Sequence, residues 1–180
     1  LTVYTSPSDG KATRLSYTKS AAQQLVNDLP DGSTFSLVTF AKIDKDVKTV
    51  VEAQEINKSN RTSILKKISD LKWADNGGTD HYKGLDKSKT ELTNADKLIT
   101  KVSGTSYVGS VRENVLVLLS DGKLEADNHS TEDVTKIANT IKGNGEGELK
   151  ATLITVGLDL SYNDATKKAE QLLMNVASKR

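Results

Sequence analysis

The sequence predicts an α/β fold in which a largely parallel β-sheet lies between two layers of helices. Short apolar runs alternate along the chain with amphipathic helical patterns, which is typical of parallel strands joined by crossover helices. The run at 151–157 is apolar on both faces, as expected for a parallel strand that helices cover on both sides. A β-branched, aromatic run at 34–41 and a second strand pattern at 47–52 are separated by the turn at Asp44-Lys-Asp46. They predict one antiparallel edge hairpin.

In the first half of the chain, one helix is expected before this hairpin in the sequence and another after it. A helical pattern runs from about Ala12 to Leu29, and Pro30-Asp-Gly32 ends it. After the hairpin, either Asn60 or Thr62 is placed to cap a second helix. The apolar stripe of that second helix consists of Ile64, Leu65, Ile68 and Leu71.

The second half continues the alternation of helix and strand. A long helix is expected after Gly77-Gly78, followed by a strand at 114–119. Ser130-Thr-Glu-Asp133 resembles a capping box, with Asp in place of Glu or Gln, and opens a helix that ends at 143–147. A final helix is expected from about 163 to 178, after the strand at 151–157. The inward side chains of the long helix are Tyr82, Leu85, Leu92, Ala95, Leu98 and Ile99, and those of the final helix are Ala165, Ala169, Leu172, Leu173 and Val176.

Composition limits the functions that the chain can have. Its 180 residues suit one domain, spanning 1–180, with a single sizeable core. The 25 basic and 24 acidic side chains nearly balance at a net charge of +1, which argues against nucleic acid or a membrane surface as the main partner. No apolar stretch is long enough to insert into a membrane. The absence of cysteine excludes disulfides, thiol catalysis and thiolate metal sites.

Three loops carry oxygen ligands that suit a hard cation. Tyr4-Thr-Ser-Pro-Ser8 is rich in hydroxyls, Asn76-Gly-Gly-Thr-Asp80 places a hydroxyl before a helix, and the apolar run from Asn114 delivers Asp121 to a loop. Such loops meet at the carboxyl edge of a parallel sheet. Hydroxyls plus a carboxylate suit Mg²⁺. Taken singly, Ser-Asp-Gly is a common turn, and Thr79 is equally well explained as a helix N-cap.

The order of these parts resembles a von Willebrand factor type A domain. Members of that family carry Asp-x-Ser-x-Ser, then a Thr in a Gly-Gly-Thr turn, then an Asp in an Asp-Gly turn after an apolar strand. Here Ser6 and Ser8 match the serines, Thr79 the threonine and Asp121 the last aspartate. The resemblance implies a three-layer α/β/α, Rossmann-like fold. It also implies a metal-ion-dependent adhesion site that holds Mg²⁺ or Mn²⁺, with Ser6, Ser8 and Thr79 in direct contact and Asp121 acting through water.

Two departures from the family pattern bear on this site. Tyr4 stands where the family places its first Asp, and only Leu1-Thr-Val precede it. The family also continues with another strand and helix beyond the point reached at Arg180. We therefore expect a domain truncated at both ends, with a weakened cation site of preserved geometry. Truncation is expected to expose an apolar stripe that includes Leu25, Leu172 and Val176.

Within the family, the Lys-rich, Cys-free composition and the segment Asp9-Gly-Lys-Ala-Thr-Arg14 look most like adhesive tip subunits of Gram-positive pili. This narrower resemblance implies an extracellular place on a cell surface or pilus, anchored to the cell wall through regions outside this chain. It also implies that the partner is a host extracellular-matrix or cell-surface protein, bound through an acidic side chain that completes the cation's ligand shell.

Alternatives to a binding module follow from the same residues. His81 and His129 lack the spacing of a zinc site and are expected at the surface or rim. No Gly-x-Ser-x-Gly elbow exists, and no general base with an orienting partner can be named, so no catalytic residue and no organic cofactor are expected. A spacer or assembly module with a degenerate metal site remains open because of Tyr4. A hydrolase that uses the same cation is the least favoured interpretation.

Overall fold

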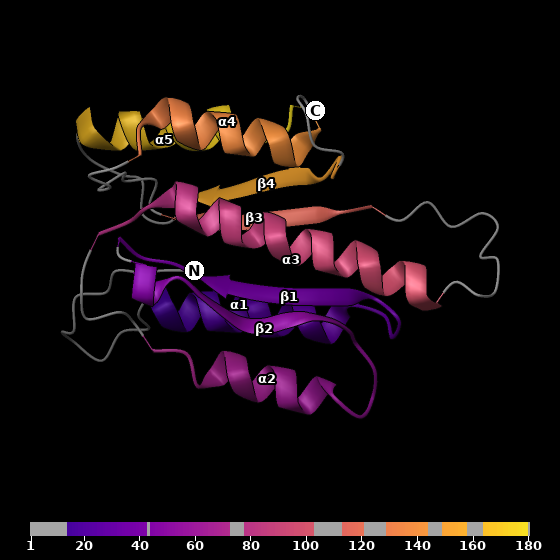
Figure 1. Ribbon diagram of the computed structural model, residues 1–180. Helices are drawn as coiled ribbons and strands as arrows, with labels where there is room; N and C mark the ends of the chain where they lie inside the picture. The colour runs from indigo at the N-terminus through magenta and orange to yellow at the C-terminus, as the bar shows by residue number, and fades with distance from the viewer. Residues whose placement is uncertain are drawn as a thin grey trace.

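The computed structural model describes residues 14–42, 44–72, 78–102, 113–120, 129–143, 149–157 and 164–179. Helices and strands alternate along these ranges (Figure 1). The elements are α1 (Arg14–Asp28), β1 (Thr34–Thr39), the 3₁₀ turn η1 (Asp44–Asp46), β2 (Lys48–Glu55), α2 (Arg61–Ser69), α3 (His81–Val102), β3 (Val115–Ser120), α4 (Thr131–Lys142), β4 (Thr152–Gly157) and α5 (Asp164–Val176). The α/β class predicted from the sequence is confirmed.

The described strands form two pairs. β1 and β2 are antiparallel, which confirms the edge hairpin. β3 and β4 are parallel and in continuous register, from Val115 opposite Thr152 to Ser120 opposite Gly157. Because α4 connects β3 to β4, this pair is the parallel unit that the alternation of strand and helix predicted.

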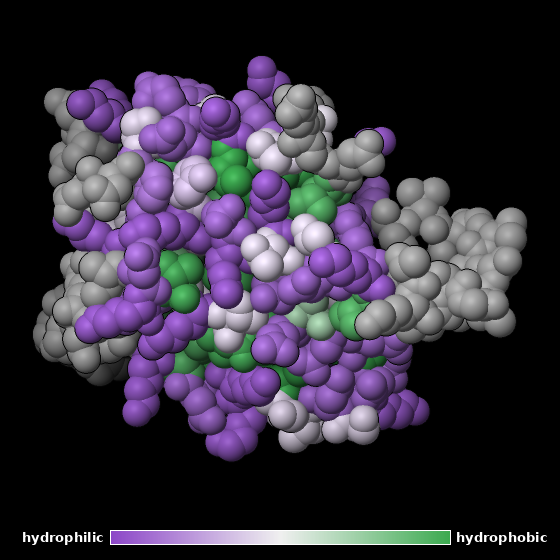
Figure 2. Space-filling view, viewed as in Figure 1, coloured by the Kyte–Doolittle hydropathy of each residue, from purple (hydrophilic) through white to green (hydrophobic). Residues whose placement is uncertain are grey.

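Helix α3 runs along both strand pairs, as Figure 1 shows. Its residue Leu85 is fully buried in a core cluster with Leu116 and Leu118 of β3, and α3 also contacts β1 and β2. A second cluster lies between the hairpin, α1 and α2, and includes Val26, Phe35, Val51, Ile56, Ile64 and Ile68. The opposite face of α3 is largely hydrophilic in the view of Figure 2. This amphipathic helix therefore carries the apolar contacts that link the two pairs.

The ends of α4 follow the predicted chemistry. The Oγ atom of Ser130 accepts from the backbone N–H of Asp133 at 3.2 Å, and the Asp133 carboxylate accepts from the backbone N–H of Ser130 at 2.8 Å. Gly143 ends the helix with a φ of 77°, a conformation that glycine adopts without steric cost. Asp133 thus replaces the usual Glu or Gln of a capping box.

The expected cap of α2 is only half right. Asn60 does occupy the N-cap position, but its side chain makes no capping hydrogen bond. The side-chain oxygen of Asn60 instead accepts from the backbone N–H of Asn57 at 3.0 Å, and its side-chain NH₂ group donates to the backbone carbonyl of Glu55 at 2.8 Å. The side chain therefore closes the turn between β2 and α2 rather than the helix end.

One expectation about exposure is wrong, and a second is met only in part within the described residues. Leu172 and Val176 are buried in the core between α5 and β4, and only Leu25 of the expected stripe is exposed. The β3–β4 pair is not covered on both faces by the described elements. Its side chains alternate, so one face is buried and the other is open. The open face carries Val115, Val117, Ile154 and Val156, which are 38 to 45% exposed.

In the described part of the chain, no helix combines the length and the hydropathy that crossing a membrane requires.

Candidate metal centre

Thr79 lies at the turn that leads into α3. Gly78 before it has a φ of 98°, and Thr79 itself is 5% exposed. The helix is capped by the next residue, because Asp80 Oδ1 accepts from the backbone N–H of Lys83 at 3.3 Å and its carbonyl accepts from that of Gly84. The alternative in which Thr79 is the N-cap is therefore wrong, and its hydroxyl is not needed to start the helix.

The other three expected ligands, Ser6, Ser8 and Asp121, lie outside the described residues. The residue before Asp121 is described. Ser120 ends β3, and its Oγ atom lies 2.7 Å from Nε2 of His81. This hydrogen bond joins the start of α3, two residues after Thr79, to the carboxyl end of β3, after which Asp121 follows in the chain. The turn of Thr79 and the end of β3 therefore meet at one edge, as parallel-sheet topology predicts.

His81 is fully buried, so its expected place at the surface is wrong. Its ring lies 5.8 Å from that of Phe40, and its Nδ1 atom has no hydrogen-bond partner among the described residues. Burial lowers the pKa of His81 from 6.5 to about 4, partly opposed by the charge of Asp80. The imidazole is thus neutral at pH 7. We assign its proton to Nε2, which donates to Ser120, because this leaves only a lone pair unpaired.

His129 lies at the rim, where the sequence placed it. Its side chain is 23% exposed, and its Nδ1 atom lies 2.7 Å from Oδ2 of Asp80. The imidazole also stacks on Tyr82, with ring centroids 4.2 Å apart and planes inclined by 16°. The Asp80 carboxylate is only 2% exposed, so this contact satisfies an oxygen that would otherwise be costly to bury.

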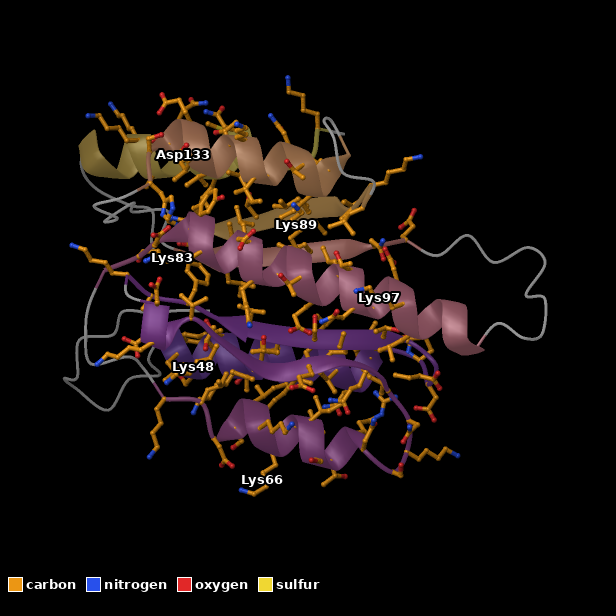
Figure 3. The ribbon with its side chains drawn as sticks, viewed as in Figure 1. Lys48, Lys66, Lys83, Lys89, Lys97 and Asp133 are labelled. Carbon is orange, nitrogen blue, oxygen red and sulfur yellow. The ribbon has the colours of Figure 1, made fainter. Side chains whose placement is uncertain are left out.

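Lys83 completes the surroundings of Asp80. Its Nζ atom lies 2.8 Å from Oδ1 of Asp44 and 3.7 Å from Oδ2 of Asp80, and it donates to the carbonyl of Lys42 at 3.3 Å. The hydrogen bond with Asp44 raises the pKa of Lys83 and lowers that of Asp44. In Figure 3, Lys83 at the start of α3 and Asp133 at the start of α4 lie at the same end of the molecule.

The donor set fits an oxygen-liganded cation on chemical grounds. Within the described ranges no cluster of three or more His, Cys, Asp or Glu side chains could hold a metal. Asp80 is the nearest carboxylate to Thr79 in sequence, and its oxygens are engaged by Lys83 and His129. A cation beside Thr79 would therefore depend on Ser6, Ser8 and Asp121. Three hydroxyls and one carboxylate are oxygen ligands, which would suit a divalent cation.

The contact between His81 and Ser120 joins the residue types of a base and a nucleophile, but with its proton on Nε2 His81 donates to the Ser120 hydroxyl and cannot take its proton. Both side chains are buried, at 0 and 1% exposure, and Nδ1 of His81 has no acidic partner among the described residues. The pair therefore ties α3 to β3 and lacks the orienting group of a triad. Sequence reasoning missed this role because only the fold places residues 81 and 120 side by side. The one available signal was the run of polar residues from Thr79 to His81 at a helix start.

Comparison with known proteins identifies the family of the chain. The family model for the von Willebrand factor type A domain matches residues 4–123, or 120 of the 180 residues. No curated protein matches the chain.

Solved structures share the fold at low sequence identity. One is proximal thread matrix protein 1 from the mussel byssus, solved with a zinc-occupied metal-ion-dependent adhesion site (MIDAS) motif. It superposes with a TM-score of 0.62 at 19% identity, and the match covers 91% of this chain and 36% of that one. A von Willebrand factor type A protein from Catenulispora acidiphila gives a TM-score of 0.56 at 18% identity, covering 91% of this chain and 38% of that one. The chain thus spans little more than a third of either. With two-thirds of its length matched by the family model, this chain belongs to the von Willebrand factor type A domain family.

Proposed function

We propose that this chain is a protein-binding module that captures a carboxylate of its partner through a divalent cation held by Ser6, Ser8, Thr79 and Asp121. The observation that carries the proposal is the position of Thr79. It is buried beside the start of α3, Asp80 caps the helix in its place, and the bond between His81 and Ser120 holds the turn near the end of β3. Membership of the family and the zinc-occupied motif of the mussel protein also support it.

The chemistry of such a site follows from its few charges. Ser6, Ser8 and Thr79 are neutral ligands, and Asp121 supplies one negative charge. A bound divalent cation then keeps excess positive charge and an affinity for a further carboxylate. Asp80 does not offset this charge freely, because its carboxylate is paired with His129 and Lys83. We favour Mg²⁺ or Mn²⁺ over Zn²⁺ because the proposed ligands are oxygens only.

The proposed setting is extracellular, on a cell surface or pilus. The proposed partner is a host matrix or cell-surface protein that presents an acidic side chain. The Lys-rich, Cys-free composition supports this setting. A role as an adhesin in the cell wall of a Gram-positive bacterium, anchored through other regions, is the form of the proposal that this composition favours.

One substitution tests the cation site. Thr79→Ala should weaken binding of Mn²⁺, measured by titration calorimetry and electron paramagnetic resonance, because it removes a direct oxygen ligand. The melting temperature without metal should stay at the parental value, because Asp80 still caps α3. Thr90→Ala is the matched control, since its hydroxyl bonds to the carbonyl of Asp86 on the same helix at 3.2 Å. Equal Mn²⁺ affinity in the parent and in Thr79→Ala would exclude Thr79 as a ligand.

A second candidate function is a spacer or assembly module without a working metal site. Tyr4 at the position of the family's first Asp favours it. The same calorimetry separates the two functions, because a parent chain that takes up neither Mg²⁺ nor Mn²⁺ supports the second. In that case Tyr4→Asp should create measurable Mg²⁺ stabilisation, seen as a rise in melting temperature when the cation is added.

A further inference from the structure

Two consecutive residues after Thr79 hold the two described ends of the segment that carries Asp121. Asp80 accepts from His129, which precedes Ser130, the N-cap of α4, and His81 bonds to Ser120, which ends β3. The distances are both 2.7 Å, and each bond spans about 40 or 50 positions in sequence. The turn of Thr79 is therefore tied to both sides of the β3–α4 connection.

The contact of Asp80 with His129 is not required to start α3. Oδ1 of Asp80 serves the backbone N–H of Lys83, whereas Oδ2 faces His129. One carboxylate thus fixes the helix with one oxygen and a distant element with the other. Its 2% exposure means that the second oxygen has little access to water as a substitute partner.

His129 is itself held in one place from two directions. Ser130, the next residue, is the N-cap of α4 and takes part in the capping box with Asp133. The imidazole face lies on Tyr82, the third residue after Thr79. The capped helix and the aromatic stack together restrict the position of the His129 donor. A binding site needs such fixed neighbours, because they hold its ligands in the geometry for binding.

We infer that His129 is a positioning residue for the cation site, acting through Asp80 on the turn that presents Thr79. The inference rests on the proposed function, since it assigns a supporting partner to the same site. In metal sites, groups that hydrogen-bond directly to the ligands typically change metal affinity by about 10- to 100-fold. His129 acts one step further out, through Asp80, so its effect should lie near the lower end of that range. The neutral tautomer with a proton on Nδ1 and the imidazolium both donate to Asp80, so the role needs only an N–H at this position.

Three substitutions at one position separate hydrogen bonding from packing. His129→Ala removes both the donor and the stack on Tyr82. His129→Phe keeps an aromatic ring for the stack but offers no donor. His129→Asn loses the ring but keeps an N–H near the position of Nδ1. We expect Mn²⁺ affinity to fall up to about tenfold in the Ala and Phe variants and to recover to within about threefold of the parent in the Asn variant.

A readout without metal addresses the turn directly. In the metal-free protein, the backbone N–H of Lys83 depends on Oδ1 of Asp80. Its hydrogen exchange, followed by NMR, should be faster in His129→Ala and His129→Phe and near parental in His129→Asn. Asp133→Ala is the control for loosening the start of α4, because it breaks the capping box without removing the imidazole. It should change the exchange of Lys83 less than His129→Phe does.

The outcomes distinguish this inference from the function on which it rests. Loss of Mn²⁺ binding in Thr79→Ala with parental affinity in His129→Phe would overturn the positioning role and leave the cation site standing. Equal losses in Asp133→Ala and His129→Phe would also overturn it, because fraying of α4 would then explain both. A parent chain that binds no Mn²⁺ while the exchange of Lys83 still responds to His129→Phe would remove the cation site, leaving His129 only a fold contact.

Discussion

At the scale of the residue, the candidate site is notable for how many polar groups it buries. Thr79, Asp80, His81 and Ser120 are all 5% exposed or less. Burying a polar side chain is unfavourable unless it finds a partner, and three of the four have one in each other or in His129. Within His81 itself, Nδ1 keeps a lone pair that is unpaired among the described residues. When the pH falls, Nδ1 takes up a proton in this buried position, so acid should destabilise the network at His81.

The pH dependence of stability should reveal the titration of His81. Its pKa of about 4 in the folded chain lies below the ordinary 6.5, so between these values the unfolded chain binds a proton that the folded chain does not. Stability should therefore fall as the pH drops from about 6.5 to about 4. The expected loss is roughly 3 kcal/mol, because a difference of one between the folded and unfolded pKa values corresponds to about 1.4 kcal/mol. Urea unfolding across this range, with EDTA present, measures the loss.

His81→Gln provides the comparison, because its amide offers a donor to Ser120 and does not titrate. Its stability should vary less than that of the parent across the pH range between the two pKa values of His81. Asp44 and Asp133 both have pKa values lowered from 3.8, so their stabilising contributions are lost only below that window. A parent and a Gln variant with parallel pH profiles would contradict the assignment to His81.

At the scale of the element, α3 is the helix on which the site depends. It is held to the hairpin by Glu91, which is 5% exposed and accepts from the Thr49 hydroxyl and the backbone N–H of Ala53, both at 2.9 Å. The pairing of β1 with β2 shifts between Phe35 and Leu37, where β2 has an extra residue. Such a bulge leaves a backbone group without a strand partner. The carboxylate of Glu91 accepts from Ala53 in place of a strand.

Gly84 sets how closely α3 approaches the hairpin. A Cβ atom at this position would lie 2.6 Å from Cγ of Phe40, whose ring is 5% exposed and packed in the core. In an unhindered helix, Gly to Ala stabilises by about 1 kcal/mol. Here Gly84→Ala should instead destabilise, by roughly 1 to 3 kcal/mol, because the ring must move. Urea unfolding measures the change.

A double substitution tests the cause. Phe40→Leu alone should cost stability by leaving space, whereas Gly84→Ala should cost less in the Phe40→Leu background than in the parent. The coupling between the two positions is then favourable. Additive effects would show that the Ala methyl does not meet Phe40.

At the scale of the whole molecule, the β3–β4 pair has one covered and one open face. Leu116, Leu118 and Leu153 point into the core beneath α4 and α5, while Val117 and Ile154 on the other face are 39 and 45% exposed. Both strands carry apolar residues on both faces, which is typical of parallel strands within a covered sheet. In the described part of the chain only one of the faces is covered.

This asymmetry predicts unequal costs for neighbouring substitutions. Leu153→Ala should destabilise by about 2 to 5 kcal/mol because it opens a cavity in the core. Ile154→Thr, one residue later, should cost less than about 1 kcal/mol in this chain, because its side chain already meets solvent. Both are measured by urea unfolding. A cost for Ile154→Thr comparable to that of Leu153→Ala would mean that the open face is covered in solution.

Local sequence alone was enough to determine the elements and the α/β class. The periodicity of α4, the capping box at Ser130 and the hairpin turn at 44–46 are short-range signals, and the structure confirms each. The turn that carries Thr79 was also recognisable, because the sequence Gly-Gly-Thr before a helical pattern is a local signal. These features depend on neighbours within a few positions, so they are legible along the chain.

Only the tertiary structure decided which residues surround Thr79 and which apolar faces are covered. His81 and His129 look alike in sequence, yet one is fully buried against Ser120 and the other lies at the rim on Tyr82. Leu172 is buried and Ile154 is open, although both follow apolar patterns. Burial depends on what packs against a side chain from distant parts of the chain. That information lies in the arrangement of the elements, and the hydrophobic periodicity within a single element does not contain it.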